Sequence, residues 1–220
     1  MRKLGRCLVS TTLLMTACAG RDSELASEPG IDGLVAEILS HSQETPDGRG
    51  FLPIAVAEGT IAKLHAGLAV QNRGDLDAMQ LHALHVIHAI DPSQVESGPG
   101  MGFGLQHAMD GIVTRVRLAM AEPQADAEVI NLANGVLANS ENVKGWADKA
   151  LSLAEEIRST TDDADAGALV VELKSQADHI VIGFDADNDG EIRSVEGEGG
   201  LRQLEGDMDE LALAIQQPPI

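Results

Sequence analysis

The amino-acid sequence predicts an all-α protein built as a helical bundle. Aromatic residues make up 2% of the 220 residues, and tyrosine is absent. Strands usually draw on aromatic and β-branched side chains, so this composition argues against a sheet. Apolar residues also recur three or four positions apart, as in Ile61, Leu64 and Leu68. This spacing places them on one face of a helix, as the core of a bundle requires.

Helix-starting and helix-ending residues divide the chain after residue 30 into seven expected helices. Asp75, and either Asp162 or Asp163, suit N-caps, and Pro53 suits the first position of a helix. Pro92 ends the third helix, and a Gly-Pro-Gly joint separates it from the fourth. The expected ranges are 33–41, 53–72, 76–91, 101–122, 125–159 (one helix, or two joined near Gly135), 163–184 and 201–215.

The first 17 residues have the pattern of an export signal. Arg2, Lys3 and Arg6 form a basic start, and an apolar stretch of about nine residues follows. That stretch is too short to span a bilayer as a helix, which needs roughly 20 residues. The run from Leu14 to Cys18, Leu-Met-Thr-Ala-Cys, then resembles the lipobox of bacterial lipoproteins, with methionine where leucine is commoner. The alternatives are an ordinary signal peptide that is cut near residue 17, or an uncleaved anchor.

The lipoprotein resemblance implies that residues 1–17 are removed and that Cys18 is lipidated as the mature N-terminus. Residues 18–30 would then be a flexible tether. Several acyl chains on one residue would hold the protein on a membrane. In this family Ala19, in place of aspartate, implies an outer-membrane lipoprotein facing the periplasm. Because Cys7 leaves with the signal, the mature chain has no thiol for a disulfide or a thiolate metal site.

The mature chain is strongly acidic. All 35 acidic residues follow Cys18, whereas three of the 15 basic residues precede it, so 12 basic residues remain and the formal charge is −23. Such a field repels nucleic acid and anionic lipid head groups, and it attracts cations or basic proteins. A simpler interpretation is that acidic surfaces keep exported proteins soluble. The sequence therefore predicts no nucleic-acid partner and leaves a basic envelope protein as one candidate partner.

A twelve-residue segment, residues 185–196, resembles the EF-hand calcium loop. Calcium takes six to eight oxygen ligands, and such a loop wraps the ion with carboxylates at its first, third and fifth positions. Gly190 takes the sixth position, where the chain turns sharply, and Ile192 is the apolar eighth residue. Phe184 matches the aromatic residue that precedes such loops. The resemblance implies as ligands Asp185, Asp187, Asp189, the backbone carbonyl of Glu191, and both carboxylate oxygens of Glu196.

Two departures from the EF-hand pattern affect the expected site. Arg193 takes the ninth position, where an oxygen side chain or a bridged water is usual, and it places a positive charge near the ion. The run 197–200, Gly-Glu-Gly-Gly, discourages an exiting helix directly after Glu196. No second loop pairs with this one, because Lys174 stands where a closing acid would be needed after Asp163. The predicted organisation is a helical bundle at 31–160 and an EF-hand-like helix-loop-helix at 161–220.

Five histidines form a second candidate site. His82, His85 and His88 lie on one predicted helix, and His65 and His107 lie on its expected neighbours. Residues three apart are set about 60° apart, so the triplet fans across roughly 120° and climbs about 9 Å. One ion could take His82 with His85, or His85 with His88, but not all three. Partly buried or surface histidines without a ligand are the simpler interpretation, and the sequence has neither a haem-attachment motif nor a Glu-x-x-His pair.

These observations predict a non-enzymatic protein, because no nucleophile elbow, phosphate-binding glycine loop or zinc-protease motif occurs. The leading hypothesis is a calcium-binding envelope lipoprotein that is anchored to the membrane, with Ca²⁺ structural or regulatory. The alternative is a periplasmic transition-metal- or haem-handling bundle that uses His65, His82, His85 and His107. A third hypothesis is an interaction module for a basic envelope protein.

Overall fold

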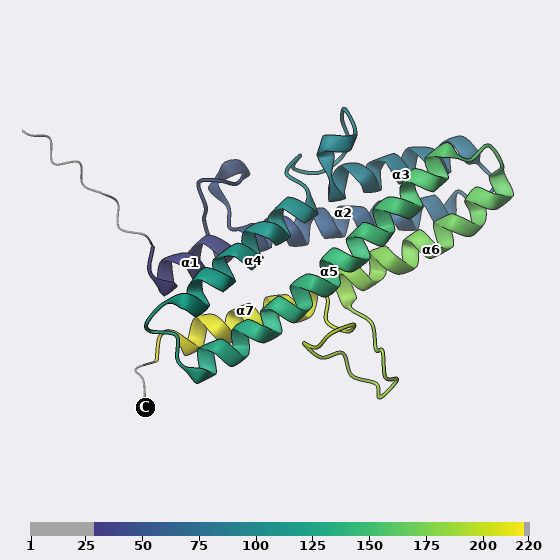
Figure 1. The fold of residues 1–220 in the computed structure, drawn as a ribbon. Helices are drawn as coiled ribbons and strands as arrows, with labels where there is room; N and C mark the ends of the chain where they lie inside the picture. The colour runs from purple at the N-terminus through teal and green to yellow at the C-terminus, as the bar shows by residue number, and fades with distance from the viewer. Residues whose placement is uncertain (1–28, 218–220) are drawn as a thin grey trace, which may run out of the picture.

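The computed structural model describes residues 29–217, and this part of the chain is all-α (Figure 1). It contains seven α-helices and two single-turn 3-10 helices, and none of these described residues is in a strand. The α-helices are α1 (Ile31–Leu39), α2 (Phe51–Gln71), α3 (Leu76–Ile90), α4 (Leu105–Ala121), α5 (Ala127–Ser159), α6 (Asp163–Ile182) and α7 (Leu201–Ala214). The 3-10 helices are η1 (Pro46–Gly48) and η2 (Pro92–Gln94). The expected signal at 1–17, Cys18 and most of the expected tether lie outside the described residues.

The longest helix, α5, organises the bundle. It packs against α3, α4, α6 and α7, and it runs along most of the molecule (Figure 1). The second long helix, α2, packs against α3, α4 and α6. One end of the bundle contains α3 and α6 with parts of α2 and α5, and the other end contains α1, α4 and α7 with the first part of α5 (Figure 1). The segment between α6 and α7, residues 183–200, projects from one side of the helices (Figure 1).

Most helix limits follow from local sequence signals. The carboxylates of Asp75 and Asp162 accept hydrogen bonds from backbone N–H groups in the first turns of α3 and α6, as predicted. Residues 127–159 form one continuous helix rather than two. Helix α2 begins at Phe51, so Pro53 is its third residue. Proline fits there because the N–H groups of the first turn have no partner inside the helix.

The start of α4 differs most from the expected position. The helix begins at Leu105 rather than at residue 101. Gly102 and Gly104 have φ values of 70° and 85°, which are incompatible with a right-handed helix. Residues 101–104 instead wrap around a buried carboxylate from α2, so the helix starts only after this turn.

A single hydrophobic core joins all seven helices, including those after residue 160. Helices α2 and α4 approach closely at Gly111, where an added Cβ would lie 2.2 Å from the ring of Phe51. The guanidinium of Arg115 lies 4.4 Å from the centre of the same ring and pairs with Glu37 and Glu44. Trp146 is 7% exposed and belongs to the core. Among residues 29–217, no helix combines the length and the apolar character that a membrane span requires.

Candidate metal centres

In the segment that resembles a calcium loop, backbone N–H groups donate hydrogen bonds to the aspartates of the same segment, and these bonds stabilise its turns. The carboxylate of Asp185 accepts from the N–H groups of Asp189 and Gly190 at 3.1 and 2.9 Å. Asp189 in turn accepts from the N–H of Glu191 at 2.9 Å. The backbone has positive φ at Asn188 (60°) and Gly190 (92°). Asparagine and glycine tolerate this left-handed conformation best, so these residue types permit the sharp turn.

Three aspartates of this segment converge. One carboxylate oxygen from each of Asp185, Asp187 and Asp189 lies within 4.8 Å of one from each of the others. Glu196 does not join this group, and both it and Glu191 are exposed. The structure therefore brings together three of the four carboxylates named from the sequence. The arrangement concentrates negative charge where a hard cation that prefers oxygen ligands could bind.

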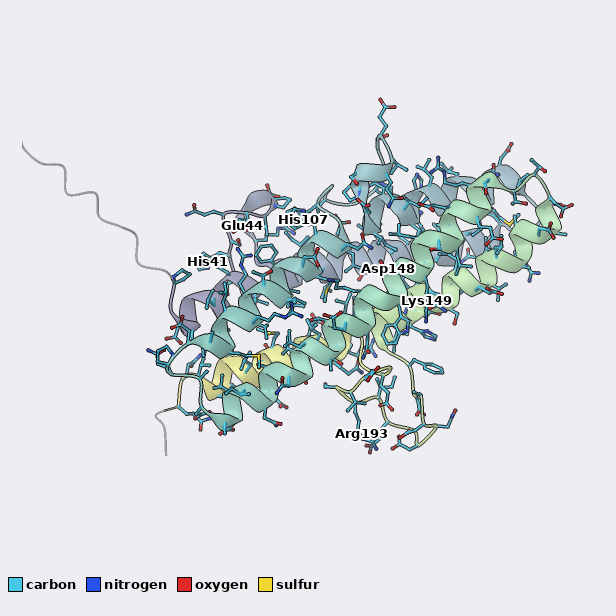
Figure 2. The ribbon with its side chains drawn as sticks, viewed as in Figure 1. His41, Glu44, His107, Asp148, Lys149 and Arg193 are labelled. Carbon is cyan, nitrogen blue, oxygen red and sulfur yellow. The ribbon has the colours of Figure 1, made fainter. Side chains whose placement is uncertain are left out.

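The guanidinium of Arg193 lies against these carboxylates. It forms ion pairs with Asp189, with Glu191 at 3.2 Å and with Asp187 at 3.6 Å. The hydrogen bond from the Glu191 N–H and the contact with Arg193 hold the pKa of Asp189 below its usual value. Figure 2 shows Arg193 on the projecting segment, away from the helices. The arginine thus acts as an internal counter-ion for the exposed aspartates.

The two ends of the segment meet at the bundle. The N–H of Phe184 donates to the carbonyl of Glu198 at 2.8 Å, which closes residues 184–198 into a loop. A Cβ at Gly183 would lie 2.4 Å from that carbonyl, and one at Gly200 would lie 2.6 Å from the N of Gly183. Glycines are therefore needed where the two backbones cross. They also explain why α7 starts at Leu201 instead of directly after Glu196.

Helix α5 holds the second half of the loop through Asn142. The side-chain oxygen of Asn142 accepts from the N–H of Gly197 at 2.7 Å, and its side-chain NH₂ donates to the carbonyl of Val195 at 2.7 Å. Because the residues on both sides of Glu196 are held, the backbone at Glu196 is fixed.

A partly buried polar cluster joins the loop to α5 and α7. The amide of Asn139 donates to Ser194 Oγ at 3.0 Å and to the carboxylate of Asp207 at 2.7 Å, and Ser194 Oγ donates to the same carboxylate at 2.8 Å. Burial raises the pKa of Asp207. Glu198 is also buried, and its carboxylate accepts from the N–H of Arg193 at 3.0 Å. Asn139, Glu198 and Asp207 belong to no motif, so the sequence did not indicate their roles.

The second candidate centre lies between α2 and α3. His65 from α2 meets His82 and His85 from α3, and one ring nitrogen of each lies within 4.8 Å of one from each of the others. His65 Nδ1 lies 3.1 Å from His82 Nδ1 and 3.3 Å from His85 Nδ1. All three side chains are partly buried. The histidines are one helical turn apart on α3, and the register of α2 against α3 brings the third ring to them.

The environment keeps these rings neutral. Burial, with added repulsion from His85 and His82, lowers the pKa of His65 to about 4. Burial also lowers the pKa values of His82 and His85. At neutral pH each ring therefore has one nitrogen lone pair and one N–H.

The other two candidate histidines serve packing instead. His88 Nδ1 lies 2.9 Å from the carbonyl of Pro99, which ties the end of α3 to the following loop. His107 stacks on Phe103 with ring centres 4.3 Å apart, and Figure 2 shows it apart from the projecting Asp185 segment. The structure therefore places neither of them with the three converging histidines.

A carboxylate that sequence reasoning missed, Glu58 on α2, organises residues 95–104. It is fully buried, and its Oε1 accepts from the N–H groups of Met101, Phe103 and Gly104 at 3.0, 3.4 and 3.3 Å. A Cβ at Gly100 would lie 2.3 Å from Glu58 Oε2. We call residues 95–104 the Glu58 loop and residues 185–196 the Asp185 loop. The only sequence signal was an acidic residue inside an otherwise apolar helix face.

Comparisons of this chain with models of protein families, with curated proteins and with solved structures found no match.

Proposed function

We propose that this protein is a calcium-binding, membrane-anchored envelope lipoprotein, in which Ca²⁺ bound by the Asp185 loop clamps the segment between α6 and α7. The observation that carries the proposal is the convergence of the Asp185, Asp187 and Asp189 carboxylates within 4.8 Å. They lie in a loop whose backbone already turns at Asn188 and Gly190. Together with the sequence pattern of the loop, this arrangement favours a hard cation with oxygen ligands.

Two changes would complete the coordination. Arg193 would leave Asp187 and Asp189, because its guanidinium cannot bind a cation. Glu196 would then rotate toward the three aspartates and close the site with both carboxylate oxygens. Each change opposes binding, since one breaks ion pairs and the other orders an exposed side chain. We therefore expect weak affinity, with a dissociation constant of about 10⁻⁴–10⁻³ M, as in extracellular calcium modules.

Weak affinity favours a structural role. A site of this strength fills only where calcium is plentiful, as it is outside the cytoplasm. Calcium that binds the folded chain alone stabilises it by about 2.7 kcal/mol when the free ion is a hundredfold above the dissociation constant. The proposed protein needs no catalytic residue for this role, so we assign it no enzymatic activity.

Membrane anchoring in this proposal depends on the sequence. The basic start, the short apolar stretch and the run that ends at Cys18 support lipidation of that cysteine. Replacement of Cys18 by serine should release the protein from the membrane fraction and remove the acyl mass. If the variant sediments with membranes as the unaltered protein does, and no acylation is found in either, the anchor proposal is wrong.

Thermal unfolding with calcium or with a chelator tests the ion site. The unaltered protein should melt at a higher temperature with calcium, and Glu196→Gln should lose most of this response because it lacks one charged ligand. Glu205→Gln, at an exposed position on α7, is the matched control and should respond as the unaltered protein does. Magnesium should substitute poorly because it requires a smaller octahedral site. Equal calcium responses in the two variants would assign the ion to another part of this acidic surface.

A further inference from the structure

We infer that His65, His82 and His85 form a second metal site, which binds one divalent transition-metal ion of the Zn²⁺ or Cu²⁺ class through three ring nitrogens. This site is independent of the calcium proposal. It lies between α2 and α3, it consists of nitrogen ligands only, and none of its residues belongs to the Asp185 loop. Imidazole is a ligand that suits zinc, copper and nickel, whereas calcium requires oxygen.

The distances between nitrogens fit a shared ion. Zinc binds imidazole nitrogen at about 2.0–2.1 Å, so two nitrogens on one tetrahedral ion are separated by about 3.3 Å. In the structure His65 Nδ1 is 3.1 Å from His82 Nδ1 and 3.3 Å from His85 Nδ1. One ring nitrogen of His82 lies within 4.8 Å of one of His85, so binding of all three to one ion requires these partly buried rings to rotate toward a common centre.

Hydrogen bonding among the rings explains the arrangement less well. A neutral ring nitrogen has either one proton or one lone pair in the ring plane. His65 Nδ1 lies close to two other nitrogens at once, so it can make one well-directed hydrogen bond but not two. A metal ion at the centre would use the lone pairs of all three rings.

The surroundings also favour ion binding. The rings are held on two packed helices rather than on a mobile loop, which limits the cost of ordering the ligands. Three histidines leave the fourth coordination position of the ion for water or another ligand. Neither remaining candidate histidine fills it, because His88 contacts the carbonyl of Pro99 and His107 stacks on Phe103.

Zinc titration of the full mature chain in excess calcium tests the site. A chromophoric chelator competes for Zn²⁺, and the unaltered protein should retain one equivalent. His65→Asn, His82→Asn and His85→Asn should each lower the affinity by at least about 100-fold. His107→Asn, at an exposed position, is the matched control and should bind as the unaltered protein does. Asp187→Asn should also leave zinc binding unchanged, which separates this site from the Asp185 loop.

Cobalt gives a second measurement that needs no variant. Co²⁺ bound by three imidazoles and one further ligand has strong visible absorption, whereas octahedral Co²⁺ on carboxylates absorbs weakly. The unaltered protein should show the strong bands, and His82→Asn should lose them. A weak octahedral spectrum in the unaltered protein would overturn the proposal. Zinc affinities that are the same in His65→Asn and His107→Asn would also overturn it.

Discussion

The Glu58 loop and the Asp185 loop both lead into a helix of the bundle, yet carboxylates organise them in opposite ways. In the Glu58 loop, N–H groups of the loop surround one carboxylate that comes from a helix. In the Asp185 loop, the carboxylates belong to the loop itself, and they face Arg193 and the solvent. The Glu58 loop surrounds a carboxylate supplied by α2. The Asp185 loop brings several carboxylates of its own together, so a bound cation would stabilise it.

The difference predicts that the conformation of the Glu58 loop does not depend on a ligand, whereas that of the Asp185 loop does. The N–H donors of Glu58 Oε1 come from the chain itself, so this contact forms whenever the chain is folded and needs no ligand, although Oε2 is buried without a hydrogen-bond partner among the described residues. Exposed aspartates that converge repel one another, and water only partly screens that repulsion. We therefore expect the Glu58 loop to be stable under all conditions and the Asp185 loop to respond to calcium.

The largest expected effect is the loss of Glu58. Glu58→Ala leaves the N–H groups of Met101, Phe103 and Gly104 without their acceptor, and we expect a loss of about 3–4 kcal/mol in the free energy of unfolding, with or without calcium. Asp187→Ala removes an exposed carboxylate and should change stability by less than about 0.5 kcal/mol in chelator. Urea unfolding measures both. Similar losses in the two variants would remove the distinction between the loops.

The next effect concerns the attachment of the Asp185 loop to α5. Asn142→Ala removes its hydrogen bonds to Val195 and Gly197, and it should lower stability by about 1–2 kcal/mol. The calcium affinity should fall as well, because the backbone on both sides of Glu196 loses its support. Asn131→Ala, at an exposed position on the same helix, controls for the change in helix propensity. If the two variants bind calcium equally, α5 does not position the closing glutamate.

A smaller effect is expected at Arg193, and it has the opposite sign. Arg193→Gln removes a positive charge beside the proposed ion and frees Asp187 and Asp189. Calcium affinity should therefore rise by roughly fivefold, which corresponds to about 1 kcal/mol for one charge near 5 Å in a watery environment. The apo protein should melt at a slightly lower temperature. Calorimetric titration measures the affinity, and Arg202→Gln is the control on α7. An affinity that is unchanged or lower would show that the arginine does not compete with calcium.

The smallest effect is spectroscopic. Trp146 is the only tryptophan, and its ring centre lies 5.6 Å from that of His179, which lies 4.8 Å from the ring of Phe184 beside the Asp185 loop. Burial lowers the pKa of His179, with Asp178 opposing and Lys149 adding to the shift.

Because a charged imidazole quenches indole fluorescence, emission should stay constant from neutral pH downward until the pH nears the lowered pKa. It should then fall, with a midpoint below 6.5. His179→Gln should abolish the transition. A midpoint at or above 6.5 would contradict the assigned burial effect. Calcium should also change the emission slightly in the unaltered protein, since Phe184 adjoins the loop.

Local signals in the sequence predicted the helices well but not what holds the loops. Asp75 and Asp162 cap their helices through neighbouring N–H groups, so a few residues contain the whole signal. The start of α4 was misplaced because it depends on Glu58, which lies 43 residues before Met101 in the chain. No short pattern records that contact.

In the candidate sites too, local spacing predicted some of the residues that converge, and helix packing determines the others. The three aspartates that converge are two residues apart, so the motif places them together without knowledge of the fold. His82 and His85 are one turn apart on α3, and this spacing also predicted that they could share an ion. His65 joins them only through the packing of α2 on α3, whereas His107 on another neighbouring helix does not. Sequence spacing cannot distinguish these two helices.

The crossing of the backbones at Gly183 and Gly200 has a consequence for how this protein can evolve. Because the loop begins and ends at the same point on the bundle, insertions, deletions or exchanges within residues 185–193 need not move α6 or α7, provided that Ser194, Val195 and Gly197 keep their contacts with α5 and α7. Descendants of this chain could therefore lose or change the proposed ion site while the helices remain unchanged. The two glycines, and not the aspartates, should then be the positions that such lineages share.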